Sequence, residues 1–234
     1  MLRRVFVFPL LAALVALAFA SVLGRRYVQR RRTYEGFWAV ALVMYAVASG
    51  AVALGAFDGW TSGEFRVYWA LGAVLNVPFL AQGELDLLIR NRGVRWALYA
   101  VLAFVTAYTI ARVRTAPIDA RALLDDLPSG KEVFGDGTPA HRLPQLISIP
   151  AYVVLVVGAI WSAWRMRGRP DLRDRFAGTL TIAVGATVIA GFGSAFAALG
   201  LLLGFSISLL AGIGAMFLGF RRAARPARDP VTAG

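Results

Sequence analysis

The stretch that decides the fold is the run 176–220, which reads FAGTLTIAVGATVIAGFGSAFAALGLLLGFSISLLAGIGAMFLGF and contains no charged residue. A single helix of 45 residues would be about 68 Å long at ~1.5 Å per residue. That length is roughly twice the ~30 Å hydrocarbon core of a bilayer. The run therefore predicts two membrane-spanning helices, 176–196 and 200–220, joined by a turn near 194–200, where Gly191, Gly193 and Gly200 allow the chain to reverse.

Five further apolar runs precede this stretch, and each is close to the ~20 residues that cross a bilayer as a helix. They are 5–24, 37–57, 67–89, 96–113 and 146–164. The composition agrees, since 59% of the residues are hydrophobic and the mean hydropathy is +0.65. We therefore predict an all-α polytopic membrane helix bundle with seven transmembrane helices, forming a single transmembrane domain over 1–234. The longest polar stretch lies in the loop 114–145, which is too short to hold a soluble domain.

The distribution of basic residues predicts the orientation. Seven spans place 17 of the 25 basic residues on one side and 8 on the other. The richer side consists of the segments 25–32, 90–95, 165–175 and 221–234. Because cytoplasmic loops carry the excess of Lys and Arg, we expect the N-terminus outside, the loop 114–145 outside and the tail 221–234 in the cytoplasm. The expected location is a bacterial plasma (inner) membrane.

The first apolar run has a second interpretation. Arg3 and Arg4, the apolar stretch after them and the tripeptide Ala18-Phe19-Ala20 also fit a signal peptide with its cleavage site. Cleavage would leave the arginines of 25–32 outside, against the charge rule, so we favour an uncleaved first helix.

The third run is the only one with charged residues well inside its ends. Its polar and helix-modifying residues form the candidate polar path: Asn76, Pro78, Gln82, Glu84 and Asp86. A charged side chain within a membrane costs several kcal/mol unless it is paired, so it is a functional candidate by default. One interpretation is a protonatable or cation-binding site facing the centre of the bundle. The other is a structural carboxylate paired with a loop arginine.

Local chemistry suggests roles for the neighbours of Glu84. We expect Asp86 to pair with Arg90 one turn later, and Gly83 to permit close helix approach. Pro78 has no amide hydrogen, so it leaves a backbone carbonyl near Val74 without its helical partner. Elsewhere we expect Glu35 to cap the second span, and Gly178, Gly185, Gly212 and Gly214 to allow tight packing of the last two spans.

The rarer residue types exclude several functions. The chain has no cysteine, a single histidine (His141) and a single lysine (Lys131), both in the loop 114–145. Thiol chemistry, bis-His haem binding and a retinal Schiff base inside the bundle are thereby excluded. The arginines lie at the ends of apolar runs, as membrane anchors do, so nucleic-acid binding is not expected. We predict no catalytic residue, no cofactor and no metal site, and hence not an enzyme. In the same loop, Pro117 and the leucines after it suggest a short helix on the membrane surface, ended by Pro128-Ser129-Gly130.

An offset of 141 residues aligns the first and fifth spans, pairing Pro9 with Pro150, Ser21 with Ser162 and Arg26 with Arg167. The layout then reads as three helices, one connecting helix and three helices (3+1+3), and parallel repeats of this kind occur in transporters. Chance similarity between two helices of like composition remains the alternative.

Two stretches resemble an uncharacterised family of bacterial seven-transmembrane-helix proteins: FRVYWALGAVLNVPFL at 65–80 and LPSGKEVFGDG at 127–137. The resemblance covers most of the chain and implies no established activity. The 3+1+3 layout with an external N-terminus is also similar to the SWEET and PQ-loop transporters. Pro144-Gln145 matches their dipeptide, although the first span has Pro9-Leu10 in place of a matching pair.

Two functions from different classes follow. A small-solute transporter or permease-like protein predicts an enclosed polar cavity near mid-membrane and a break in the third helix at Pro78. A non-transporting membrane sensor or accessory subunit of a membrane complex predicts a solid bundle, with its function in the external loop or on a surface that meets a partner. The expected partners are the lipid bilayer, a small solute, and a second copy of the chain or another membrane protein.

Overall fold

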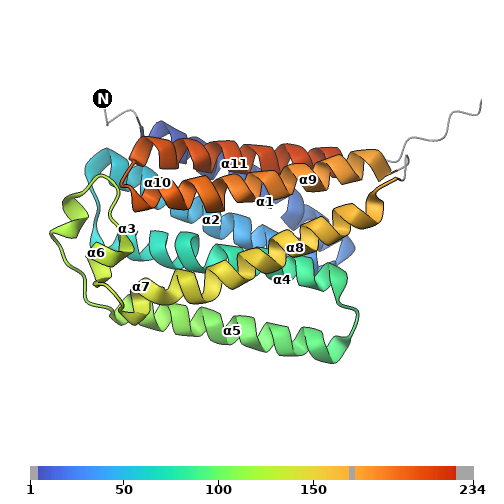
Figure 1. Cartoon of the computed structure of the whole chain (residues 1–234), viewed down its shortest axis with the longest axis horizontal. Helices are drawn as coiled ribbons and strands as arrows, with labels where there is room; N and C mark the ends of the chain where they lie inside the picture. Colours follow the sequence, from blue (N-terminus) through green and yellow to red (C-terminus); the bar gives the residue numbers. More distant parts are fainter. Residues whose placement is uncertain (1–4, 169–171, 225–234) are drawn as a thin grey trace, which may run out of the picture.

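The computed structural model describes residues 5–168 and 172–224, which form an elongated bundle whose long helices run along its length (Figure 1). The elements, in chain order, are α1 (Val7–Arg30), α2 (Thr33–Asp58), α3 (Ser62–Val67), η2 (Tyr68–Leu75), α4 (Asn76–Leu88), α5 (Arg92–Thr115), η3 (Ala122–Leu124), α6 (Gly130–Phe134), α7 (Pro139–Leu143), η4 (Pro144–Ser148), α8 (Ile149–Met166), α9 (Arg173–Thr187), η6 (Val188–Gly193), α10 (Ser194–Ala198) and α11 (Leu202–Ala223).

Within these residues, six helical runs are long and apolar enough to cross a membrane. They are Val7–Arg30, Thr33–Asp58, Arg92–Thr115, Pro139–Met166, Arg173–Ala198 and Leu202–Ala223. The chain is therefore a multi-pass membrane protein. The helices extend a few residues beyond the predicted apolar runs, so the connection between α5 and α7 is shorter than the predicted loop 114–145.

Six helices form a closed ring in chain order. α1 packs on α2, α2 on α4, α4 on α8, α8 on α9, α9 on α11, and α11 returns to α1. α5 lies outside this ring, against η2, α4 and α7. It is the lowest helix in Figure 1. Only 11% of its most apolar part is buried, compared with 56% for α2.

The segment 62–88 is helical throughout, as α3, η2 and α4. It is not among the six long apolar runs, because its second half carries the polar residues of the candidate path. Pro78 does not break it, contrary to what the transporter hypothesis predicted. The π-helical turns of η2 end three residues before the proline, and α4 continues without interruption to Leu88.

The carbonyl that Pro78 leaves without an amide partner is satisfied from another helix. The hydroxyl of Ser148, at the end of η4, donates to the carbonyl oxygens of Ala73 and Val74, at 2.8 and 3.0 Å. Ala73 and Val74 lie five and four residues before Pro78. An amide hydrogen at position 78 would have donated to the Ala73 oxygen in a π-helix or to the Val74 oxygen in an α-helix. The expected free carbonyl thus becomes a contact between the third helical segment and the entry of α8.

The run 176–220 turns as predicted, between α10 and α11 at Gly200, which has a φ of +65°. The backbones of α9 and α11 lie in direct contact at their glycines. A Cβ placed on Gly185 would lie 2.6 Å from the carbonyl oxygen of Gly212, and one on Gly178 would lie 2.5 Å from that of Gly219. Gly214 has no neighbour within 4 Å of such a Cβ, so it does not contribute to this packing.

The first apolar run is an integral part of the bundle. α1 packs on both α2 and α11. The tripeptide Ala18-Phe19-Ala20 lies inside this helix, and the Phe19 ring packs on the rings of Phe217 and Phe220, with centroids 5.2 and 4.9 Å apart.

The loop between α5 and α8 covers one end of the bundle (Figure 1, left). The predicted surface helix beginning at Pro117 is wrong: only the short 3-10 turn Ala122–Leu124 forms, and Ser129 starts α6 instead of ending a helix. The reason is that Leu123 and Leu127 are buried in the core, so this segment folds onto the bundle.

Aromatic residues fill this covered end. They form a connected cluster of Trp60, Phe65, Tyr68, Trp69, Phe134 and Phe205, with neighbouring centroids 5.5 to 6.5 Å apart. The indole nitrogens of Trp60 and Trp69 donate to loop carbonyls at Asp126 and Ala140. We call this the aromatic plug.

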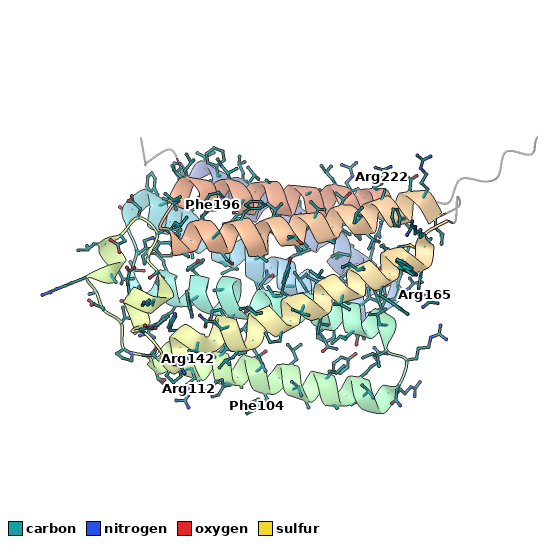
Figure 2. All side chains as sticks on the ribbon, viewed as in Figure 1. Phe104, Arg112, Arg142, Arg165, Phe196 and Arg222 are labelled. Carbon is teal, nitrogen blue, oxygen red and sulfur yellow. The ribbon has the colours of Figure 1, made fainter. Side chains whose placement is uncertain are left out.

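The outer surface has the distribution expected in a bilayer. The side of α5 carries exposed Phe104, while arginines lie at both ends, with Arg112 and Arg142 at one and Arg165 and Arg222 at the other (Figure 2). Charged ends and an apolar middle are typical of helices that cross a membrane.

Candidate functional site

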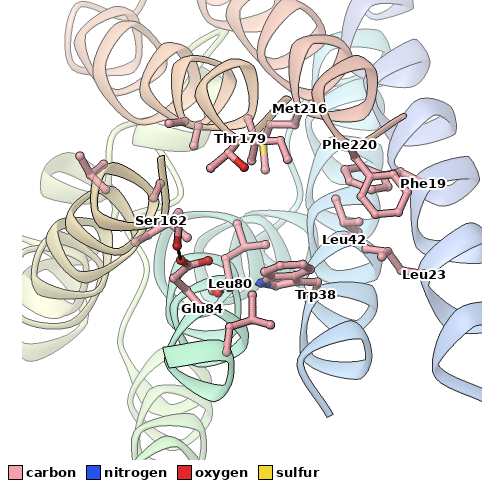
Figure 3. A pocket seen from close by; sticks show the side chains of 17 residues that line it. Phe19, Leu23, Trp38, Leu42, Leu80, Glu84, Ser162, Thr179, Met216 and Phe220 are labelled. Atoms are coloured by element: carbon pink, nitrogen blue, oxygen red, sulfur yellow. Dashed lines mark hydrogen bonds between the residues drawn. The ribbon is translucent and has the colours of Figure 1, made fainter. Parts of the chain in front are cut away.

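A cavity of about 170 Å³ lies inside the ring (Figure 3). All six ring helices contribute to its wall, and α5 does not. The lining residues lie within about four helical turns of the helix ends that carry the arginine clusters. The cavity therefore occupies the half of the bundle away from the aromatic plug, nearer one end than the predicted mid-membrane position.

The wall of this cavity is mostly apolar, and the predicted polar cavity is wrong. Its lining residues are Phe19, Leu23, Trp38, Leu42, Leu80, Glu84, Leu87, Leu155, Val156, Ala159, Ser162, Thr179, Ile182, Ala183, Ala186, Met216 and Phe220. The indole N–H of Trp38 already donates to the carbonyl of Leu80 at 3.1 Å. The side chains of Glu84, Ser162 and Thr179 are then the polar groups left to meet a ligand.

Glu84 is the one charged residue in this wall. Its side chain projects from α4 into the cavity, with Thr179 and Met216 on the opposite side (Figure 3). The residue is only 7% exposed. Ser162, on α8, donates to its Oε1 at 3.1 Å.

Small residues make room for this carboxylate. A Cβ on Gly158 of α8 would lie 2.5 Å from Cγ of Glu84, so a larger residue there would push the side chain away. On the other side of α4, a Cβ on Gly83 would lie 2.2 Å from the indole nitrogen of Trp38. Gly83 therefore permits the close helix approach predicted for it.

The other residues of the candidate polar path lie elsewhere. Asn76 is buried against α2 and donates to the carbonyl of Ala41 at 3.1 Å. Gln82 donates to Asp86, and Pro78 is buried beside the contact with η4. Of the five predicted residues, the cavity wall contains only Glu84, so they do not line one path.

Asp86 has a different partner from the one we predicted. Arg95, at the start of α5, holds its carboxylate at 3.2 Å, and the hydroxyl of Tyr99 donates to both of its oxygens. Arg90 does not do this because α4 ends at Leu88 and Ile89 is extended, so Arg90 does not lie one helical turn after Asp86. The pair fastens α5 to the outside of the ring.

Glu35 is a second buried carboxylate, and it lies in the first turn of α2, at the helix N-terminus as predicted. It is 3% exposed, makes no capping hydrogen bond, and has an Oε2 without a partner among the described residues. It lies one helical turn from Trp38, towards the end with the arginine clusters. Since Trp38 bonds to α4 at Leu80, Glu35 lies at about the level of Glu84 on the neighbouring helix.

Sequence reasoning missed the partners of Glu84. Ser162 and Thr179 are single small polar residues in apolar helices, a pattern that serves helix packing as often as ligand binding. The one available signal was Gly158 four residues before Ser162, which places a small residue and a hydroxyl on one face of α8.

The described residues contain no group of three or more His, Asp or Glu side chains that could hold a metal ion. On the aromatic side of the wall, the guanidinium of Arg26 lies 4.6 Å from the centroid of the Phe220 ring. Comparison with protein-family models, with curated proteins and with solved structures found no match to this chain.

Proposed function

We propose that the chain is a small-solute transporter of the bacterial inner membrane and that the cavity around Glu84 is its solute site. The observation that carries the proposal is a buried carboxylate that points into a cavity built by all six ring helices. A carboxylate without a cationic partner is costly inside a membrane and is usually retained for function. Among the described residues, Glu84 forms no ion pair, whereas Asp86 and Asp174 do.

The segment 62–88 serves as the third of seven spans in this proposal. Its 27 residues are long enough to cross a bilayer, and it occupies a place in the ring beside α2 and α8. Its polar residues, which set it apart from the six more apolar helices, face buried partners instead of lipid. Seven spans then put the N-terminus outside and the tail 221–234 in the cytoplasm.

The ring supports a 3+1+3 arrangement. α1, α2 and the α3–α4 segment form one unit, and α8, α9 and α11 form the other, while α5 connects them from outside. Within each unit the first helix packs on the second and the second on the third, as two parallel repeats about an axis along the membrane normal would give. The cavity lies where the two units meet, and Glu84 of the first unit contacts Ser162 of the second.

Rocking of the two units would expose the cavity to each side in turn. The aromatic plug and its loop close the outer end, so we assign the structure to a state closed towards the outside. Opening outwards requires the plug to separate, because it joins α3 and η2 of the first unit to Phe205 of the second.

The absence of cysteine from the chain makes the proposal testable by single-cysteine labelling in native membranes. Thr179→Cys places a thiol in the cavity wall, Thr109→Cys places one in a fully buried position on α5, and Thr115→Cys places one on the exposed loop end. Membrane-impermeant maleimide is applied to right-side-out and then to inside-out vesicles.

Transport by alternating access predicts that Thr179→Cys reacts from both sides, Thr115→Cys only from outside, and Thr109→Cys from neither. Reaction of Thr179→Cys from one side only, or from neither, would reject transport. The result would then favour the alternative, a sensor or an accessory subunit. Labelling of Thr115→Cys from the cytoplasmic side would reject the proposed orientation.

A further inference from the structure

We propose that the cavity takes a small organic monocation, with the Glu84 carboxylate as its counter-charge. This inference rests on the proposed function for its physiological meaning, but it concerns binding alone. It follows from the chemistry of the wall, which combines one acid, two hydroxyls and an otherwise apolar surface.

The wall argues against the other common classes of small solute. A sugar has hydroxyls in every direction, and burying them against leucine, alanine and phenylalanine would leave most of them without hydrogen-bond partners. An anion would meet the carboxylate. A divalent metal ion prefers six or more oxygen ligands, and the wall offers one carboxylate and two hydroxyls.

A monovalent organic cation matches each part of the wall. Ser162 satisfies one oxygen of Glu84, and the described residues donate no hydrogen bond to the other, so that oxygen remains for a ligand. The rings of Phe19, Trp38 and Phe220 surround the rest of the space. Ammonium groups are attracted to the faces of such rings as well as to carboxylates.

The size of the cavity limits the cation. An apolar cavity of about 150 Å³ admits a benzene-sized molecule, so the volume of about 170 Å³ here suits one ring or a short branched chain with a single charged head. The charged head would lie beside Glu84 on α4. The apolar part would extend towards Met216 and Phe19, on the far side of the cavity (Figure 3).

The test uses the full-length protein in detergent and a pair of probes that differ in charge. They are 2-phenylethylammonium and its uncharged near-isostere 2-phenylethanol, titrated into protein by calorimetry at neutral pH, with benzyltrimethylammonium as a cation of fixed charge. The variant Glu84→Gln removes the charge and keeps the shape. The matched control Glu132→Gln makes the same change at an exposed carboxylate of α6, outside the cavity wall.

We expect both cations to bind wild type at least about tenfold more tightly than they bind Glu84→Gln, since tenfold corresponds to ~1.4 kcal/mol and buried charge pairs are commonly worth more. Glu132→Gln should bind both cations as wild type does, within about threefold, and 2-phenylethanol should not distinguish wild type from Glu84→Gln. Circular dichroism and melting curves establish that both variants are folded.

Equal binding of charged and neutral probes, or equal cation binding by wild type and folded Glu84→Gln, would overturn the inference. So would the failure of both cations to bind wild type. None of these results depends on movement of the helices, whereas the cysteine experiment uses no ligand. If wild type binds the cations but Thr179→Cys is labelled from one side only, this inference stands and the transport proposal fails.

Discussion

The contact between Ser148 and the carbonyls before Pro78 gives a quantitative prediction about how the third helical segment is held. Replacing Ser148 with alanine removes the hydroxyl that donates to the Ala73 and Val74 oxygens. Ser148 is buried, with 9% exposure, so water cannot easily replace the lost donor. Leaving a buried acceptor unsatisfied costs about 1–3 kcal/mol in soluble proteins.

The membrane lowers this figure. Hydrogen bonds between membrane helices average about 0.6 kcal/mol and reach about 1.7 kcal/mol, because the unfolded reference state also finds partners. Here one hydroxyl serves two carbonyls that have lost their amide donor, so the upper part of that range applies. We expect Ser148→Ala to lower the free energy of unfolding by about 1–1.5 kcal/mol.

The decisive measurement is a double-mutant cycle with Pro78→Ala. Alanine at 78 restores an amide hydrogen that can donate to the Val74 oxygen, so Ser148 is no longer needed for it. The double variant should therefore be less destabilised than the sum of the single variants, by about 1 kcal/mol, a typical coupling for groups in contact. Equilibrium unfolding in mixed dodecylmaltoside and SDS micelles, followed by circular dichroism, supplies the four stabilities.

Thr106→Ala provides the control, because its hydroxyl donates only to the carbonyl of Leu102 on its own helix. That change should be additive with Pro78→Ala. If Ser148→Ala and Pro78→Ala are also additive to within about 0.5 kcal/mol, the hydroxyl does not replace the missing amide, and our account of the third helical segment is wrong.

Two further predictions concern packing around the ring. Gly185→Ala puts a Cβ 2.6 Å from a backbone carbonyl of α11, so it should lower the unfolding free energy by about 1–3 kcal/mol. Gly214→Ala, with open space around it, should be neutral or stabilising. Equal effects of the two changes in the SDS titration would refute the backbone contact. Asp86→Asn should cost about 2–3 kcal/mol, below the 3–5 kcal/mol of a fully buried pair because the Arg95 side chain is 28% exposed. Arg90→Ala should stay within about 0.5 kcal/mol of wild type. If Arg90→Ala lowers the unfolding free energy as much as Asp86→Asn does, Asp86 pairs with Arg90 after all.

The membrane character of the chain could be read from the sequence because it depends on local quantities. The length of each apolar run and the thickness of a bilayer predict the long helices, and the length of the run 176–220 alone predicts its reversal. Backbone chemistry was equally local: Pro78 lacks an amide hydrogen in any fold, so the free carbonyl near Val74 was predicted. The interfaces made by Gly178, Gly185 and Gly212 followed from their small size.

The candidate site was predicted only as a single residue. Glu84 stood out because a carboxylate inside an apolar run is rare. Its neighbours in the sequence, Gln82 and Asp86, share its polarity but not its direction, because side chains two residues apart do not face each other on a helix. The sequence alone therefore grouped residues that the fold separates.

Composition and periodicity thus determined that this chain crosses a membrane, roughly where its helices begin and end, and which residue is costly to bury. The tertiary structure decided that six helices close into a ring with α5 outside, that Glu84 faces a cavity, and that Asp86 pairs with Arg95. The physical reason is the range of the interactions involved. Apolar length and a missing amide act within one helix, whereas the contact between Glu84 and Ser162 joins residues 78 apart in the chain, and only the packing of the helices brings them together.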